Sequence, residues 1–148
     1  MKISTKGRYA TRAMLDLALH YGKTTPVLLK DISARQGISL RYLEQIVSPL
    51  IAAKLVNSTR GPRGGVSLAR PPRKIRILDI IQVLEGPIAP VDCVDNPGVC
   101  TRAPSCVARD VWTDLAKAMC GVLESTTLQD LVERQSRKEP GKELLYSI

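Results

Sequence analysis

The sequence has few aromatic side chains and almost no histidine. Among its 148 residues there are no Phe, one Trp, four Tyr and one His. The core therefore has to be built from Leu, Ile, Val and Ala, a composition that leans towards helices. A single histidine, His20, also gives a zinc finger little support.

Long apolar runs are missing as well. Charged residues interrupt even the best helical stretches, so no segment reaches the ~18 apolar residues that cross a bilayer. The chain opens with MKISTKGRYATR, which is polar where a signal peptide requires an apolar stretch. We expect a cytoplasmic protein without membrane contact, folded as one compact domain or as a small domain with a dimerisation arm.

Acidic residues are absent between Glu44 and Asp79. Residues 1–85 carry 15 Lys+Arg against 5 Asp+Glu, whereas residues 86–148 carry 7 against 9. A cationic front half is typical of proteins that bind polyanions, although a solvated basic surface has the same composition. The cations inside the acid-free stretch are Lys54, Arg60, Arg63, Arg70, Arg73, Lys74 and Arg76.

The first half of the chain has the periodicity of a helix-turn-helix. Apolar spacing predicts a helix over about 5–21, and a short helix over 28–36 ends at Gly37. A longer helix follows from Leu40, with Ser39 as its N-cap. In this arrangement the last helix lies in the major groove of DNA.

The residues of this last helix divide into two faces. We expect an inward stripe made of Leu40, Leu43, Val47, Leu50 and Ile51. The outward side chains can read base edges, since Arg suits guanine, Gln suits adenine and Glu accepts from cytosine. They are Arg41, Glu44, Gln45 and Ser48. Pro49 predicts a kink or a helix end nearby.

Two β-like runs, 55–60 and 66–70, flank the segment Gly61-Pro62-Arg63-Gly64-Gly65. This pattern predicts a hairpin, and a hairpin after a helix-turn-helix predicts a winged helix. Arg60 and Arg63 would lie in a minor groove, and Gly64 and Gly65 would let the backbone approach phosphates. The simpler alternative is a β-turn with incidental arginines.

The second half predicts a short helix over 77–84, an irregular loop over 88–105, a long amphipathic helix over 106–123 and a short helix over 128–137. The apolar stripe of the long helix should pack on a second copy of the chain. We therefore expect a mostly α fold with a small β-hairpin wing. Its parts are a winged helix-turn-helix domain (1–86), a cysteine-bearing loop (87–105), a dimerisation helix with the following short helix (106–137) and a flexible tail (138–148).

Three of the four cysteines, Cys93, Cys100 and Cys106, lie close together with the spacing C-x6-C-x5-C. Grouped cysteines in a cytosolic chain indicate metal binding or redox chemistry more often than structural disulfides. Iron–sulfur ligation fits better than zinc, because no C-x2-C pair is present. Surface thiols or a reversible disulfide are the alternatives.

A fourth ligand is harder to assign. Cys120 lies roughly 21 Å along a continuous helix from Cys106 at ~1.5 Å per residue, which indicates a small buried apolar residue instead. The remaining candidates are Asp92, Asp95, Asp110, a residue of the partner's first helix, or an exogenous thiol or water.

Four segments together resemble the iron–sulfur cluster regulator (IscR) type of winged-helix transcription factors, within the wider Rrf-two family. They are KISTKGRYATRAMLDLA, DISARQGISLRYLEQI, RGPRGGVSLAR and the three cysteines followed by CVARDVW. The resemblance runs to about residue 137. It implies a bacterial homodimer on a partly palindromic operator, and a [2Fe–2S] or [4Fe–4S] cluster.

Position by position, the resemblance implies that Cys93, Cys100 and Cys106 are the cluster ligands. It also implies that Ser39 to Gln45, including Tyr42, form the DNA-reading helix. One position departs from the pattern, because Arg109 stands where cluster-assembly regulators have a histidine three residues after the last cysteine. Arginine stays protonated and is a poor ligand.

The leading hypothesis is a transcriptional regulator without catalysis, a repressor by preference, that senses iron–sulfur cluster, redox or iron status. The alternative is a regulator of cysteine or sulfur metabolism that has the same fold but no cluster. It would act through thiol oxidation or through a partner protein such as a cysteine-biosynthesis enzyme. A small electron carrier or redox enzyme is disfavoured by the three ligands without a fourth cysteine nearby and by the basic front half. The hydrolase motifs G-x-S-x-G and H-E-x-x-H are absent as well.

Overall fold

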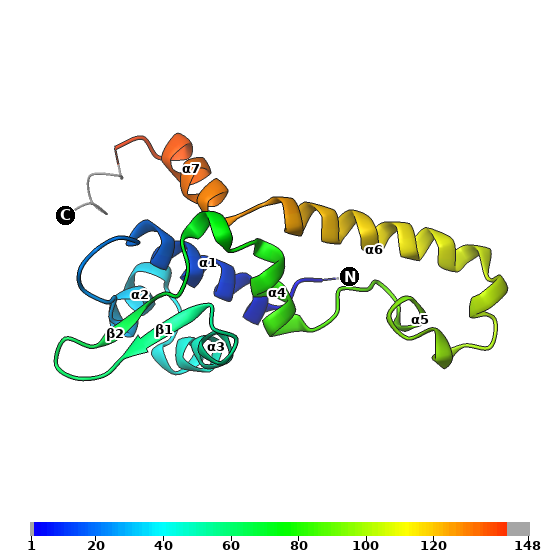
Figure 1. Cartoon of the computed structure of the whole chain (residues 1–148), viewed down its shortest axis with the longest axis horizontal. Coiled ribbons are helices and arrows are strands. Elements are labelled where there is room, and N and C mark those ends of the chain that lie inside the picture. Colours follow the sequence, from blue (N-terminus) through cyan, green and yellow to red (C-terminus); the bar gives the residue numbers. More distant parts are fainter. Residues whose placement is uncertain (1, 142–148) are drawn as a thin grey trace.

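The computed structural model describes residues 2–141 and shows a helical body with a two-stranded hairpin on one side and a long helical arm (Figure 1). The mostly α fold with a β-hairpin wing is confirmed. The main elements are α1 (Thr5–Leu19), α2 (Leu29–Gln36), α3 (Leu40–Ala52), β1 (Val56–Thr59), β2 (Gly65–Leu68), α4 (Ile77–Glu85), α5 (Asp92–Asp95), α6 (Val107–Ser125) and α7 (Leu128–Lys138). Short 3-10 turns occupy Pro72–Lys74, Pro97–Val99 and Ala103–Ser105.

The core is aliphatic, as the composition requires. Met14, Ile32 and Leu43 are fully buried where α1, α2 and α3 meet, and Ile80 of α4 joins them. Burying an aliphatic side chain of this size contributes roughly 1.5–3 kcal/mol before the entropy cost of ordering it. This body holds α3 at a defined angle.

Asp16 is a buried carboxylate that joins the first two helices. It is fully shielded from solvent and accepts hydrogen bonds from Arg35 Nε at 3.0 Å and from Arg35 Nη2 at 2.8 Å. Gln36 Nε2 donates a third bond at 3.0 Å. The charge is therefore paired, which offsets much of the cost of removing it from water.

The wing is joined to the turn before α2. Strands β1 and β2 pair antiparallel, and Val27 forms a β-bridge with Val66 through two backbone hydrogen bonds of 2.8 Å. Gly65 has φ +153°, and a Cβ there would lie 2.5 Å from the Val27 carbonyl oxygen. Only glycine permits this close approach, so the wing is held against the body.

The chain leaves the body after α4, reaches the far end of the molecule near α5 and returns along the arm α6 to α7, which lies on the body (Figure 1). Leu128, at the start of α7, is fully buried within the core, and Arg76 forms a β-bridge with Thr127. α7 therefore packs on the body, and the division of the chain into units stays a prediction. No helix within residues 2–141 is long and apolar enough for a membrane span.

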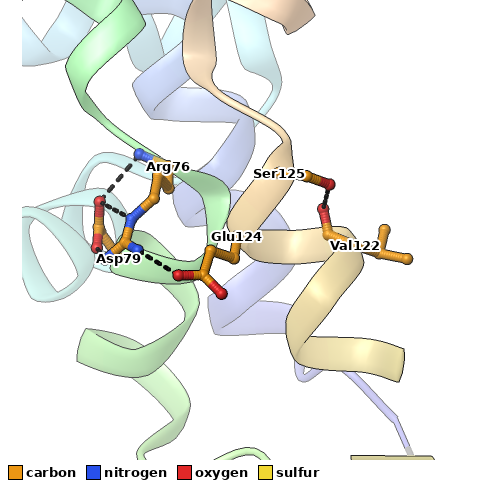
Figure 2. Close-up of polar contacts among 5 residues, drawn as sticks. All are labelled: Arg76, Asp79, Val122, Glu124 and Ser125. Carbon is orange, nitrogen blue, oxygen red and sulfur yellow. Dashed lines mark hydrogen bonds and ion pairs between the residues drawn. The ribbon is translucent and has the colours of Figure 1, made fainter. Parts of the chain in front are cut away.

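Arg76 ties α4 to the end of α6 (Figure 2). Its Nη2 atom lies 2.8 Å from Asp79 Oδ1, and its Nη1 atom lies 3.0 Å from Glu124 Oε1. Burial raises the pKa of Asp79, but the side-chain and backbone hydrogen bonds from Arg76 outweigh it, so that this pKa lies below its usual value. The same contacts raise the pKa of Arg76.

Several expected details differ from the structure. Leu40 is exposed rather than inward, because Ile38 fills the core at the start of α3, and Ile46 occupies the missed inward position. By contrast, the helix end predicted near Pro49 is present, since α3 continues through Pro49 and ends at Ala52.

The loop expected to be irregular over 88–105 contains α5 and two 3-10 turns. Pro97 begins the first of these turns and Pro104 is the second residue of the other, positions where the fixed φ and missing N–H of proline are tolerated. Of the expected flexible tail 138–148, residues 142–148 lie outside the described part.

Candidate functional site

The outer face of α3 presents polar side chains to solvent. Arg41, Glu44, Gln45 and Ser48 are exposed, as the periodicity predicted. Together with Lys6 and Pro49 they line one shallow hollow of the surface. Lys6, on the first turn of α1, was not among the predicted residues, because only the packing of α1 against α3 brings it there.

Two of the predicted residues also serve the helix itself. Ser39 caps α3, since its hydroxyl accepts a hydrogen bond from the Tyr42 backbone N–H at 3.2 Å. The half-buried Tyr42 ring packs edge-on against Tyr9, with ring centroids 5.8 Å apart. The guanidinium of Arg12 lies 5.5 Å from the centre of the Tyr9 ring. These contacts fix how α3 sits on α1.

The wing tip carries the predicted cations Arg60 and Arg63, both exposed. Each of the two predicted glycines has a structural role. A Cβ on Gly64 would lie 2.3 Å from the Thr59 carbonyl oxygen, and Gly65 makes the close approach to Val27 described above. The glycines are therefore required by the wing itself, whatever they do for phosphate contact.

The three loop cysteines occupy successive short elements at the far end of the arm. Cys93 lies in α5, Cys100 follows the 3-10 turn Pro97–Val99, and Cys106 is the N-cap residue of α6. Cys93 and Cys106 are half-buried, Cys100 is exposed, and all are free thiols. Within residues 2–141, no three Cys, His, Asp or Glu side chains are grouped so that they could hold a metal ion.

Arg109 joins this loop to the arm. Its Nε atom donates a hydrogen bond of 2.9 Å to the Cys93 carbonyl oxygen, from one turn inside α6. The residue that replaces the expected histidine thus holds the loop through its backbone. Cys120 is half-buried in the unbroken helix α6, which keeps it far from Cys106 along the chain, as expected.

One side of α6 is apolar and uncovered in the single chain. Val107 is 78% exposed, Val111 57% and Val122 66%, and these three valines lie on one side of the helix. Trp112 is 40% exposed and lies about 100° around the helix from Val111. Ala116 is buried and Leu123 packs against the core on another side. Large uncovered apolar surfaces on a helix mark an interaction site.

A family model described as "Rrf2: Iron-dependent Transcriptional regulator" matches residues 3–134 of this sequence. The chain belongs to the Rrf2 family. It is a transcriptional regulator rather than an enzyme. This is the family that the four sequence segments resemble, and its match covers the reading helix, the wing, the cysteine loop and the arm.

Individual Rrf2 proteins similar to this chain carry two different names. The chain is 42% identical over 135 residues to the transcriptional regulator IscR of Klebsiella pneumoniae, covering 91% of this chain and 82% of that protein. The solved structure of IscR from T. potens has a TM-score of 0.77 at 42% identity, covering 94% of this chain and 91% of that one.

The structure of CymR, described as the global cysteine regulator of B. subtilis, is equally similar. Its TM-score is 0.77 at 44% identity, and the match covers 90% of this chain and 98% of that one. IscR and CymR are thus about equally similar to this chain, and similarity does not choose between the two hypotheses.

Proposed function

We propose that this Rrf2 regulator binds double-stranded DNA with α3 in the major groove and the wing in the minor groove. In this proposal Arg41, Glu44 and Gln45 contact base edges, because they are exposed on one face of α3. Arg60 and Arg63 at the wing tip contact the minor groove and its phosphates. Ser39, Tyr42, Gly64 and Gly65 complete the interface by holding its backbone in position.

We propose further that the working unit is a homodimer. Its interface would be the exposed face of α6, where valines and a tryptophan are uncovered in the single chain. A two-fold dimer presents two reading helices to a partly palindromic operator, in successive major grooves roughly 34–36 Å apart. Occupying such a site within a promoter would repress transcription.

For the signal, we propose that Cys93, Cys100 and Cys106 sense iron–sulfur cluster, redox or iron status. The observation that carries this proposal is the placement of three free thiols on one short segment, which Arg109 attaches to the start of the dimer helix. The thiols would be the ligands of a [2Fe–2S] or [4Fe–4S] cluster. As they stand in this conformation they do not form a ligand set.

That last observation favours a second candidate. The same fold could serve as a regulator of cysteine or sulfur metabolism without a cluster, through thiol oxidation or through a cysteine-biosynthesis enzyme as partner. The similarity to CymR supports this alternative as strongly as the similarity to IscR supports the first.

Anaerobic purification separates the two candidates. A coloured protein with stoichiometric iron and acid-labile sulfide would support cluster sensing. A colourless, iron-free protein that still binds duplex DNA would support the second candidate and contradict the first.

The ligand assignment has its own test in Cys100→Ala, because Cys100 is exposed and its loss should leave the fold intact. We expect this variant to lose iron and sulfide while it remains a folded dimer. Cys120→Ala is the matched control and should keep both. Stoichiometric iron in Cys100→Ala would show that the assignment is wrong.

A further inference from the structure

The exposed charged side chains of α1 are all cationic. They are Lys6, Arg8 and Arg12, whereas the one acid of this helix, Asp16, is buried and paired with Arg35 of α2. Lys6 lies beside the outer face of α3. Arg12, six residues further along α1, makes the contacts that connect this helix to both halves of the helix-turn-helix.

Arg12 is attached to the turn between α2 and α3. Its Nε atom donates a hydrogen bond of 3.3 Å to the side-chain oxygen of Gln36, and its Nη2 atom donates to the Gln36 carbonyl oxygen. Gln36 is the last residue of α2, and Gly37 then reverses the chain with φ +63°. A cation is favoured at this position, because the carbonyl end of a helix carries partial negative charge.

The guanidinium of Arg12 is also held against an aromatic pair. It lies 5.5 Å from the centre of the Tyr9 ring, and that ring packs edge-on against Tyr42 in the first turn of α3. Arg12 is therefore fixed beside both the end of α2 and the beginning of α3. The proposed base contacts start in the same turn, at Arg41.

These contacts leave the charge of Arg12 in place. In the described part of the chain its partners are a carbonyl oxygen, an amide oxygen and a ring, none of which has a net charge. A guanidinium has five N–H donors, and the contacts with Gln36 use two of them. Arg12 is exposed, so its other donors can meet an anion. Phosphate suits them, because the planar fork can donate two parallel hydrogen bonds to it.

An α-helix with its side chains is about 10–12 Å across and fills a major groove that is about 12 Å wide. A residue beside the helix therefore faces the phosphates at the edge of the groove. We propose that Arg12 binds one of these phosphates through the N–H groups that Gln36 leaves unused. This inference rests on the proposed placement of α3 on DNA. The contact would fix the position of α3 on the duplex without reading a base.

Salt-dependent binding of a fluorescent duplex of random sequence tests the proposal. For Arg12→Gln we expect roughly three- to ten-fold weaker binding near physiological salt and a log–log salt slope shallower by about 0.9 for each phosphate lost. Arg12→Lys keeps the charge and should keep the wild-type slope. Arg137→Gln, the same change at an exposed residue of α7, is the matched control and should bind like the wild type.

The salt slope separates a phosphate contact from a purely structural role. If Arg12 only supported the turn between α2 and α3, Arg12→Gln and Arg12→Lys would weaken binding alike and both would keep the wild-type slope. That result would overturn the inference, and so would an Arg12→Gln variant that binds like Arg137→Gln. In both cases the proposed function stands. If the wild type binds no duplex, the proposed function fails and this inference fails with it.

Discussion

At the scale of single residues, the structure separates side chains that hold the fold from those left to contact a partner. Asp16 has no exposed surface and accepts three side-chain hydrogen bonds from α2. Gln45 is exposed, and its surroundings on α3 are other exposed polar residues. Both are polar residues within helices, and only their neighbours tell them apart.

Asp16→Asn should destabilise the protein by about 1.5–3 kcal/mol, because hydrogen bonds to a charged group are lost while the volume is kept. The midpoint of urea unfolding measures this loss. Asp31→Asn, an exposed carboxylate on α2, is the matched control and should shift the midpoint little. Equal midpoints for the two variants would contradict the anchoring role of Asp16.

Gln45→Ala should relax the preference for one base pair of the operator by about 1–3 kcal/mol, because a paired contact with adenine is lost. Arg63→Ala should instead weaken all duplexes similarly and lower the salt slope by about one. Competition between single-base operator variants measures the difference. If the two variants behaved alike, the assignment of Gln45 to base contacts and of Arg63 to phosphate contacts would be wrong.

At the scale of elements, the junctions are stabilised by close backbone approaches and by capping side chains. The wing depends on Gly65, and α4 and α7 both begin with reciprocal caps in which Asp79 and Asp130 accept backbone hydrogen bonds. Hydrogen bonds from the Thr127 backbone and hydroxyl lower the pKa of Asp130. These features lie at element ends, where short motifs can be recognised.

Gly65→Ala should destabilise the fold by more than about 1 kcal/mol, because its φ of +153° disfavours a side chain and the new Cβ would strike the Val27 carbonyl. Thermal unfolding measures the loss, and duplex binding should weaken with it as the wing moves. Gly98→Ala, where a Cβ meets only an ordinary contact, is the control. An unchanged melting temperature for Gly65→Ala would argue against the wing junction described here.

The lowered pKa of Asp79 implies an acid-sensitive junction between α4 and α6. The folded state holds the ionised carboxylate more tightly than the unfolded chain does. Its contribution is therefore fully present above the unfolded pKa of about 3.9 and is lost as pH falls through the lower folded value.

Asp79→Asn should reduce the dependence of stability on pH in this acid range. Denaturant unfolding at a series of pH values measures that dependence. Asp114→Asn, which removes an exposed carboxylate from α6, should leave it unchanged. If both variants retain the wild-type acid dependence, Asp79 does not contribute to it.

At the scale of the whole molecule, the body that carries α3 and the wing is joined to the cysteine loop by the arm α6, which exposes apolar side chains. In the proposed dimer, a second copy of the chain would place two bodies side by side. Each cysteine loop would then lie close to the α6 helices at the interface. The proposed sensing site at the cysteines and the proposed DNA contacts would then be linked through one rigid element, the helix α6.

If the proposed dimer forms through α6, Val111→Glu should convert it to a monomer, because it places a charge within the apolar face. Sedimentation velocity measures the change, and operator binding should weaken through loss of the second reading helix. Lys117→Glu adds an acid at an exposed position outside the set of apolar residues and should remain dimeric. A monomeric wild type would contradict the proposed interface.

Most elements could be predicted from the sequence because their signals are local. Glycine ended α2, serine capped α3, and apolar spacing marked α1, α6 and α7 within a few residues of their observed bounds. Leu40 was expected to face inward but is exposed, and the buried Ile46 was not predicted. Apolar spacing along a helix does not by itself show which residue of each turn faces the core. The ligand assignment of the three cysteines stays a prediction.

The sequence by itself determined the helical class, the order of the elements, the cationic front half and the grouping of three cysteines in one segment, because composition and short-range spacing encode these directly. Only the tertiary structure decided that Asp16 anchors α2, that Lys6 lies beside the outer face of α3, and that α7 packs on the core. These features depend on residues far apart in the chain, whose meeting is set by packing of the whole core.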